Sequence, residues 1–244
     1  IKLVGQREPG VVLQDGRIID GNRRFTCMRI LAKEDYNLGY FEAVILDKDI
    51  ELNKKQIKLL ELALQHGTDA IVDYDPIDKL VGMYKDIEEN KLLTINEYCQ
   101  STNESLRVVE RKLKEAKLMV EFLEFIRAPK QYHIARKLAI DGPLLEILMI
   151  LEKETDEDVQ NDLKICLFSL LLAKPDGDIT RYVREVKKLV GTDFMTPFIE
   201  EQKVNAYSLH EILPADQVTT IEYINENVRS NEEIKTNMSN TLDK

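Results

Sequence analysis

Residues 11–25 read VVLQDGRIIDGNRRF. Two short apolar runs lie on either side of a Gln-Asp-Gly turn, which is the pattern of a β-hairpin. An Asp-Gly pair and two arginines follow, and apolar residues then continue at near-helical spacing to Leu31. The stretch therefore predicts strand, turn and strand, and then a helix that begins directly after Asp20-Gly21.

The junction between the second strand and this helix has the chemistry of an anion site. A helix N-terminus offers N–H groups without partners in the helix and the positive end of its dipole. Gly21 permits close approach of the backbone, and Arg23 and Arg24 supply forked donors that suit phosphate oxygens. From these residues alone, a phosphate site and a solvated turn with ion pairs are equally good interpretations.

The rest of the chain is predicted to be mostly helical, apart from one strand at about 40–46. Asp75-Pro76 is typical of a helix start, and that helix is expected to reach about Glu89. Capping-box spacing predicts further helix starts at Thr94 and at Ser101. The fold class is thus α+β, with a small α/β N-terminal domain followed by mostly α-helical domains.

Later helices are expected at 143–151, 162–172 and 179–190, with Asp178 as the N-cap of the last. An acidic loop is expected at 152–158. The polar composition near the C-terminus predicts an irregular tail. The expected domains are 1–70, 71–127, 128–200 and the tail at 201–244.

The composition limits the class of protein. Acidic residues outnumber basic ones by 44 to 34, so the formal charge is −10. Hydrophobic residues make up 43% and charged residues 32% of the chain, which is typical of a globular protein. No apolar run approaches the ~20 residues that span a bilayer, so no membrane partner is expected. An acidic protein does not coat nucleic acid through bulk charge, so any DNA contact needs a local basic face.

The three cysteines are scattered without CxxC spacing, and the three histidines lie far apart. This pattern speaks against a disulfide framework or a metal site, and it favours a reducing, cytoplasmic setting. Cys27, in the predicted first helix, is expected to pack against the sheet.

Residues 94–118 have the arrangement of a helix-turn-helix: a short helix, a polar turn and a long helix. Between Ser105 and Lys137 there are nine Lys or Arg and four Asp or Glu, a local charge of 9 − 4 = +5. The predicted DNA contacts are Asn103, Ser105 and Arg107 for base edges and Arg111 and Lys112 for phosphates. An ordinary amphipathic helix with a basic polar face is the alternative interpretation.

Together these motifs resemble the ParB family, whose N-terminal domain has the ParB/sulfiredoxin fold. The resemblance covers about residues 1–125 and is closest at 11–25, after the run Gly5-Gln6-Arg7-Glu8-Pro9. In that family a Gly-x-Arg-Arg motif grips the triphosphate of a nucleotide, a Glu-Asn-x-Gln-Arg motif follows, and a helix-turn-helix comes after it. Leu62-Ala63-Leu64-Gln65 and residues 93–118 stand at the corresponding places here.

The resemblance implies a nucleotide-responsive protein that binds double-stranded DNA as a homodimer, in plasmid or chromosome partition or in regulation on a mobile element. Its ligand would be a ribonucleoside triphosphate, CTP or ATP. The nucleotide-binding residues that it implies are Gln6, Gly21, Asn22, Arg23, Arg24 and Gln65.

Two departures from the family pattern bear on Mg²⁺ and on hydrolysis. Asn22 stands where the family commonly has Glu, and Leu62 and Ala63 stand where it has Glu and Asn. Mg²⁺ usually needs at least one carboxylate beside the phosphates. Weakened Mg²⁺ coordination and impaired hydrolysis are therefore expected.

Two other functions stay open from the sequence. The same fold hosts nucleases, kinases and sulfiredoxins, and as an enzyme this chain would use Asp20 and Glu8 as its acidic groups. Alternatively, the chain is a helix-turn-helix transcriptional regulator whose ParB-like domain has lost its ligand.

Overall fold

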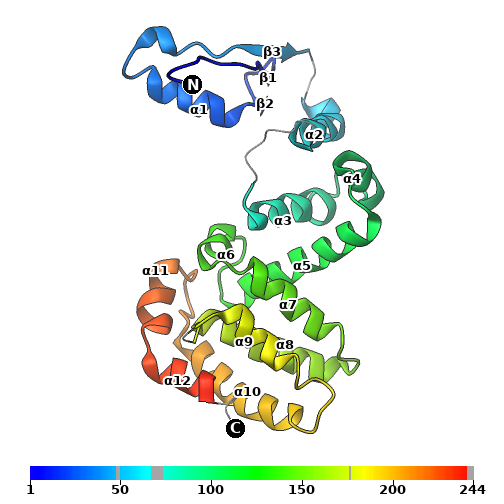
Figure 1. The fold of residues 1–244 in the computed structure, drawn as a ribbon, viewed down its shortest axis with the longest axis vertical. Coiled ribbons are helices and arrows are strands. Elements are labelled where there is room, and N and C mark those ends of the chain that lie inside the picture. The colour runs from blue at the N-terminus through cyan, green and yellow to red at the C-terminus, as the bar shows by residue number, and fades with distance from the viewer. Residues whose placement is uncertain (48–49, 67–73, 176, 241–244) are drawn as a thin grey trace. The chain divides into compact units, whose positions relative to one another are not determined.

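A computed structural model of the chain describes residues 1–47, 50–66, 74–175 and 177–240. It has the expected α+β class, with a three-stranded sheet near the N-terminus and helices elsewhere (Figure 1). The chain divides into an N-terminal unit, Ile1–Asp73 with Asp86–Val109, and a C-terminal unit, Tyr74–Lys85 with Glu110–Lys244. This division does not follow the limit expected at 127, and the limit expected at 70 lies outside the described residues.

The sheet of the N-terminal unit begins with the predicted hairpin, which is confirmed. Strand β1 (Gly10–Leu13) pairs antiparallel with β2 (Ile18–Asp20) and parallel with β3 (Ala43–Leu46), in the order β2-β1-β3. The turn is closed by the Leu13 N–H, which donates to the Arg17 carbonyl at 2.8 Å. Because β2 ends at Asp20, the chain enters the next helix at Gly21.

The helices of the N-terminal unit follow the sheet. They are α1 (Asn22–Leu31), the 3₁₀ turn η1 (Tyr36–Leu38), α2 (Ile50–His66), the π-helix η2 (Lys85–Glu89) apart from its first residue, which belongs to the C-terminal unit, and α4 (Ile95–Thr102). Helix α2 is kinked at Asn53 and packs against β2 and α4. Lys58 of α2 lies 3.2 Å from the carboxylate of buried Asp86, so an ion pair ties α2 to η2.

The C-terminal unit is helical, and α8 is its central helix. Its elements are α3 (Pro76–Tyr84), most of α5 (Leu106–Phe125), α6 (Tyr132–Leu138), α7 (Asp141–Leu151), α8 (Glu157–Ala173), α9 (Ile179–Val186), α10 (Met195–Ile212), α11 (Ile221–Tyr223), the π-helix η3 (Ile224–Arg229) and α12 (Glu232–Asn240). Helix α8 packs against α7, α9, α10, α12 and η3 (Figure 1). It is apolar on nearly every side from Leu163 to Ala173, as a helix surrounded by others must be.

Most of the predicted helix starts are confirmed, because capping depends on residues only two or three positions apart. The Asp75 carboxylate accepts from the Ile77 N–H at 2.9 Å, and Asp178 caps α9 in the same way. The helix expected from 162 begins earlier, at Glu157, because the Asp156 carboxylate accepts from the first N–H groups of α8. The acidic loop therefore ends at Asp156.

The prediction of an irregular tail at 201–244 is wrong for its described residues, 201–240. Helices α10, α11 and α12 occupy most of this segment, and Ile224, Val228 and Met238 are buried. A polar side chain within the segment joins two of its helices: Gln202 Nε2 in α10 donates to the Met238 carbonyl in α12 at 3.1 Å. The polar composition belongs to the outer faces of these helices, while sparse apolar residues dock them.

Candidate nucleotide and nucleic-acid sites

The first candidate site is the turn from β2 into α1. Gly21 precedes α1 with φ 96°, in the left-handed region, and no side chain caps the helix at this position. A Cβ at Gly21 would lie 2.9 Å from the Phe41 ring and 3.2 Å from the Gly10 Cα. Both the backbone angle and the space require glycine here, so the motif's glycine has a structural reason that does not depend on a ligand.

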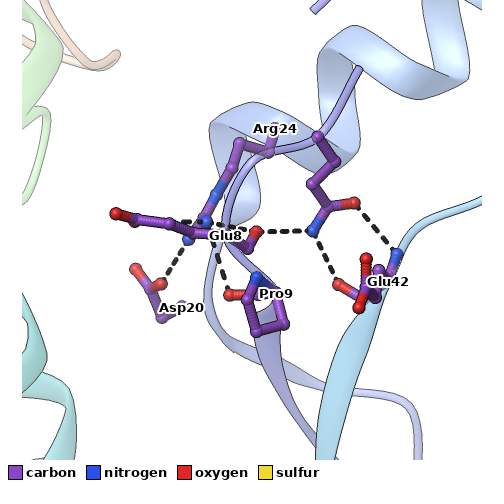
Figure 2. Close-up of polar contacts among 6 residues, drawn as sticks. Glu8, Pro9, Asp20, Arg24 and Glu42 are labelled. Atoms are coloured by element: carbon purple, nitrogen blue, oxygen red, sulfur yellow. Dashed lines mark hydrogen bonds and ion pairs between the residues drawn. The ribbon is translucent and has the colours of Figure 1, made fainter. Parts of the chain in front are cut away.

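The Arg24 guanidinium is engaged in hydrogen bonds and an ion pair with other residues of the chain. Its Nη1 donates to the Glu8 carbonyl at 2.7 Å and to the Pro9 carbonyl at 3.3 Å, and its Nη2 lies 2.5 Å from Asp20 Oδ2 (Figure 2). The side chain is only 23% exposed. Arg24 therefore clamps the segment before β1 and the end of β2 onto α1.

Gln6 is also used internally. Its Nε2 donates to the Glu8 and Glu42 carbonyls at 2.8 and 2.7 Å, and its Oε1 accepts from the Glu42 N–H at 2.9 Å. The amide thus aligns the chain before β1 with the chain before β3. Gln6 and Arg24 both contact residue 8, so the structure brings these two predicted residues together.

The other predicted nucleotide-binding residues, Asn22, Arg23 and Gln65, lie on two different helices. Asn22 and Arg23 are exposed in the first turn of α1, and the Asn22 amide lies 3.5 Å from the Ile18 carbonyl. Gln65 lies on α2, where its amide donates to Glu61 at 3.2 Å. Arg23 is therefore the arginine of the pair whose side chain reaches solvent.

The two candidate catalytic carboxylates, Asp20 and Glu8, both face Arg24. Asp20 lies at 2.5 Å and Glu8 Oε2 at 3.8 Å from the guanidinium (Figure 2). Both carboxylates thus face the same guanidinium, which is the geometry of a structural ion-pair cluster.

The second candidate site is the segment from α4 to the start of α5. The predicted capping box at Thr94 is confirmed, because Thr94 and Glu97 satisfy each other's backbone N–H groups. A bond from Lys55, followed by those from Thr94, lowers the pKa of Glu97 to about 2. These contacts fix the start of α4.

The helix start predicted at Ser101 is wrong. The hydroxyls of Ser101 and Thr102 donate to the Glu97 and Tyr98 carbonyls within the last turn of α4. Asn103 then ends α4 in the left-handed conformation, with φ 55°. Serine and threonine also bond backward along a helix, so the capping-box spacing was satisfied here without a helix start.

The predicted DNA contacts lie in the turn and in the first two turns of α5. Asn103 and Ser105 are exposed in the turn, where the Ser105 carbonyl accepts from the Val109 N–H. Arg107 and Arg111 are exposed and four residues apart, so they share one face of α5, whereas Lys112 is half-buried. The division between the two units falls within α5, after Val109.

A buried carboxylate lies beside the basic residues of α5. Glu115 is 9% exposed, and burial raises its pKa to about 7 despite the opposing charges of Arg111 and Lys112. Asp141, in the first turn of α7, raises the pKa further. Glu115 is therefore partly protonated near neutral pH.

Sequence reasoning missed Phe41 and Gly10. Phe41 contacts Phe25 edge-to-face, with ring centroids 5.4 Å apart, and a Cβ at Gly10 would lie within van der Waals overlap of its ring. The Phe41 ring covers the place where the backbone at Gly10, in β1, comes close to the backbone at Gly21, just before α1. Glycine at the first position of β1 is the signal that could have indicated such a close approach.

The cysteine prediction is partly wrong. Cys27 is exposed on the outer face of α1 and does not pack against the sheet, because Phe25 and Met28 supply the inner face. Cys166 is buried in α8, and burial raises the pKa of its thiol to about 12. This thiol is unreactive at neutral pH.

Comparison with known proteins adds no family: the chain matches no protein-family model, no curated protein and no solved structure. Within the described ranges, no group of three or more His, Cys, Asp or Glu side chains is arranged to hold a metal ion. None of the helices in the same ranges has the length and apolar character needed to cross a bilayer.

Proposed function

We propose that this chain is a ParB-like, nucleotide-responsive DNA-binding protein, acting as a cytoplasmic homodimer in plasmid or chromosome partition or in regulation on a mobile element. The observation that carries the proposal is the β2–α1 junction. A left-handed glycine there starts a helix with two arginines in its first turn, and no side chain occupies the capping position. Such a junction suits an anionic ligand.

The ligand would be a ribonucleoside triphosphate, CTP or ATP, bound through its phosphates. Arg23 reaches solvent from the first turn of α1, so it is the arginine that we assign to the phosphates. Arg24 would shape the loop through the Glu8 and Pro9 carbonyls. Asn22 carries no charge and Asp20 is paired with Arg24, so the proposal does not require Mg²⁺.

The duplex would be contacted by Asn103, Ser105 and Arg107, with Arg111 and Lys112 on phosphates. The exposure of four of these five residues supports this assignment. Nucleotide would affect DNA binding only if it stabilised one conformation more than another.

The test is calorimetry with the four ribonucleoside triphosphates, each with and without Mg²⁺ and duplex DNA. We expect one nucleotide to bind, Arg23→Ala to weaken its binding at least tenfold, and Arg17→Ala to leave it unchanged. Arg17 is a suitable control because it is an exposed arginine in the same unit, paired with Asp15. Binding that survives Arg23→Ala would refute the phosphate assignment.

One observation favours a second function, a helix-turn-helix regulator whose α/β part binds no nucleotide. Both Gln6 and Arg24 are engaged in internal hydrogen bonds, as a purely structural role requires. Duplex binding without any nucleotide binding in the same calorimetry would support this function. Nucleotide turnover or DNA cleavage would instead support the enzyme, with Asp20 and Glu8 as its acidic groups.

A further inference from the structure

The segment from Phe125 to Ile140 contains no acidic residue. The chain has 44 Asp and Glu in 244 residues, yet these sixteen positions hold Arg127, Lys130, Arg136 and Lys137 together with His133. The segment includes the end of α5, the turn after it and α6. A region without carboxylates in an acidic protein is a local site of positive charge.

Helix α6 places its basic residues on one exposed face. Ile134, Ala135 and Leu138 are buried, and they anchor α6 in the C-terminal unit. His133, Arg136 and Lys137 are exposed at positions i, i+3 and i+4, which lie together on a helix surface. Lys130 is exposed in the preceding turn, where its φ is 63°.

Packing against α3 holds this face in place. Helices α3 and α6 are in contact, and Lys85 Nζ lies 5.1 Å from the centroid of the Tyr132 ring at the start of α6. Arg136 Nη1 lies 3.2 Å from Asp78 Oδ2, and both side chains are about half exposed. The ion pair orients Arg136 at the edge of the face.

We propose that Lys130, His133, Arg136 and Lys137, the α6 basic face, bind backbone phosphates of duplex DNA outside the helix-turn-helix segment. The inference rests on the proposed function, because it names a further contact with the same duplex. Arg111 and Phe125 are 14 residues apart in α5, about 21 Å along the helix axis at 1.5 Å per residue. The α6 basic face follows in sequence just after this far end of α5. It would therefore meet phosphates several base pairs from those at Arg111.

Charge and exposure favour DNA over an anionic membrane as the partner. Interfacial helices that bind membranes insert large apolar side chains beside their basic residues. Among the described residues, no exposed large hydrophobic side chain lies between 125 and 140. Phosphates of a duplex need only the charges, and each phosphate neutralised changes the log–log salt slope by about 0.9.

The experiment measures binding of the full chain to a mixed-sequence duplex of about 30 base pairs, between about 50 and 200 mM salt. The test variant is Lys130→Gln with Lys137→Gln. Its matched control is Lys153→Gln with Lys188→Gln, which removes the same charge from exposed lysines of the same unit. Circular dichroism verifies that both variants fold, and Lys130→Arg with Lys137→Arg should bind as the wild type does.

We expect the test variant to bind at least tenfold more weakly at the lowest salt and to flatten the slope by about 2, with no change in the control. Equal loss in test and control variants would overturn the inference. So would unchanged binding by the test variant, and in that case Arg107→Ala with Arg111→Ala decides the proposed function separately.

Two further outcomes separate the inference from the proposed function. If the α6 variant weakens binding and the α5 variant does not, the α6 basic face is the DNA site and the helix-turn-helix assignment fails. If the wild type binds phosphatidylserine vesicles through these lysines and binds no duplex, both the inference and the proposed function are wrong.

Discussion

Different interactions stabilise the α/β segment, residues 1–47, and the C-terminal unit. In the described residues 1–47, the buried hydrophobic side chains are Leu13 and Met28. The C-terminal unit instead has one continuous apolar core, which includes Phe122, Leu167 and Phe168. Burial of apolar surface contributes about 25 cal/mol per Å², so the segment with two buried side chains must gain much of its order elsewhere.

The segment gains that order from polar contacts with well-defined partners. Arg24 binds two backbone carbonyls and Asp20, and the Gln6 amide makes three bonds that align the strands. Charge-assisted hydrogen bonds are directional, whereas apolar packing is not. Residues that look like ligand-binding groups in the sequence are therefore also the ones that hold this small segment together.

The largest expected effect tests the apolar side of this comparison. Phe122 is fully buried and contacts Phe168 edge-to-face at 5.4 Å, so Phe122→Ala should destabilise the C-terminal unit by about 3–5 kcal/mol. Val204→Ala, on the exposed face of α10, should change stability by less than about 0.5 kcal/mol. Urea unfolding followed by circular dichroism measures both. Equal effects would contradict the core described here.

The next effect tests the polar side. Arg24→Ala removes three hydrogen bonds from a mostly buried guanidinium, and we expect it to destabilise the sheet and α1 by about 2 kcal/mol. Arg17→Ala breaks an exposed ion pair in the hairpin and should cost less than about 0.5 kcal/mol. Hydrogen exchange of the β1 and β2 amides resolves the difference. Unchanged exchange in Arg24→Ala would show that the clamp contributes no stability.

A glycine pair sharpens the comparison further. Gly21 and Gly16 both have positive φ, 96° and 88°, but a Cβ meets Phe41 only at Gly21. Gly16→Ala should cost about 1 kcal/mol from backbone strain alone, and Gly21→Ala about 1 kcal/mol more. Thermal unfolding of the two variants, together with Phe41→Leu in the Gly21→Ala background, isolates the ring contact. Equal costs for Gly16→Ala and Gly21→Ala would show that the contact with Phe41 adds nothing to the cost of a side chain at position 21.

The smallest expected effect concerns the buried charge in the apolar unit. The pKa of Glu115 is raised to about 7 in the folded state, above the ordinary value of 4.5. The unfolded chain therefore releases this proton first, and stability should fall as the pH rises from about 4.5 to about 7. Glu115→Gln should remove this dependence, gaining about 1 kcal/mol at pH 8 after partial screening by water.

The check on Glu115 is the difference between wild type and variant in urea unfolding across pH. At pH 4 both side chains are neutral, so the two proteins should be equally stable. Glu121→Gln is the matched control, because Glu121 is exposed on the same helix and paired with Lys164. A gap that is already present at pH 4 would indicate a packing effect of the substitution and not a titration.

The sequence predicted the hairpin, the start of α1 and the caps at Asp75, Thr94 and Asp178. Each of these features depends on residues only a few positions apart along the chain. The spacing of residues in the sequence is therefore sufficient to predict them. The same rule failed at Ser101, where a backward bond to Glu97 competes with capping. Local patterns are reliable only where one local partner is available.

Long-range contacts explain the other differences between the predicted and the observed structure, at the C-terminal segment and at Cys27. Residues 201–240 were expected to be irregular, but they dock on α8, where the Leu172 carbonyl accepts from Arg229, and on one another, as in the bond from Gln202 to the Met238 carbonyl. Cys27 is exposed because Phe25 and Met28 occupy the inner face of α1. Periodicity could not distinguish these arrangements, because each depends on which side of a helix meets a distant element.

The sequence by itself therefore determined the local elements, the positions of most helix ends and the segments where basic residues gather. Only the tertiary structure decided how those residues are used: it engaged Arg24 and Gln6 in internal bonds, left Arg23 exposed, and placed the charges of α6 on one outer face. The physical reason is range. Caps and turns satisfy backbone groups two or three residues away, whereas the partner of a guanidinium or the burial of an apolar side chain depends on residues brought together by folding.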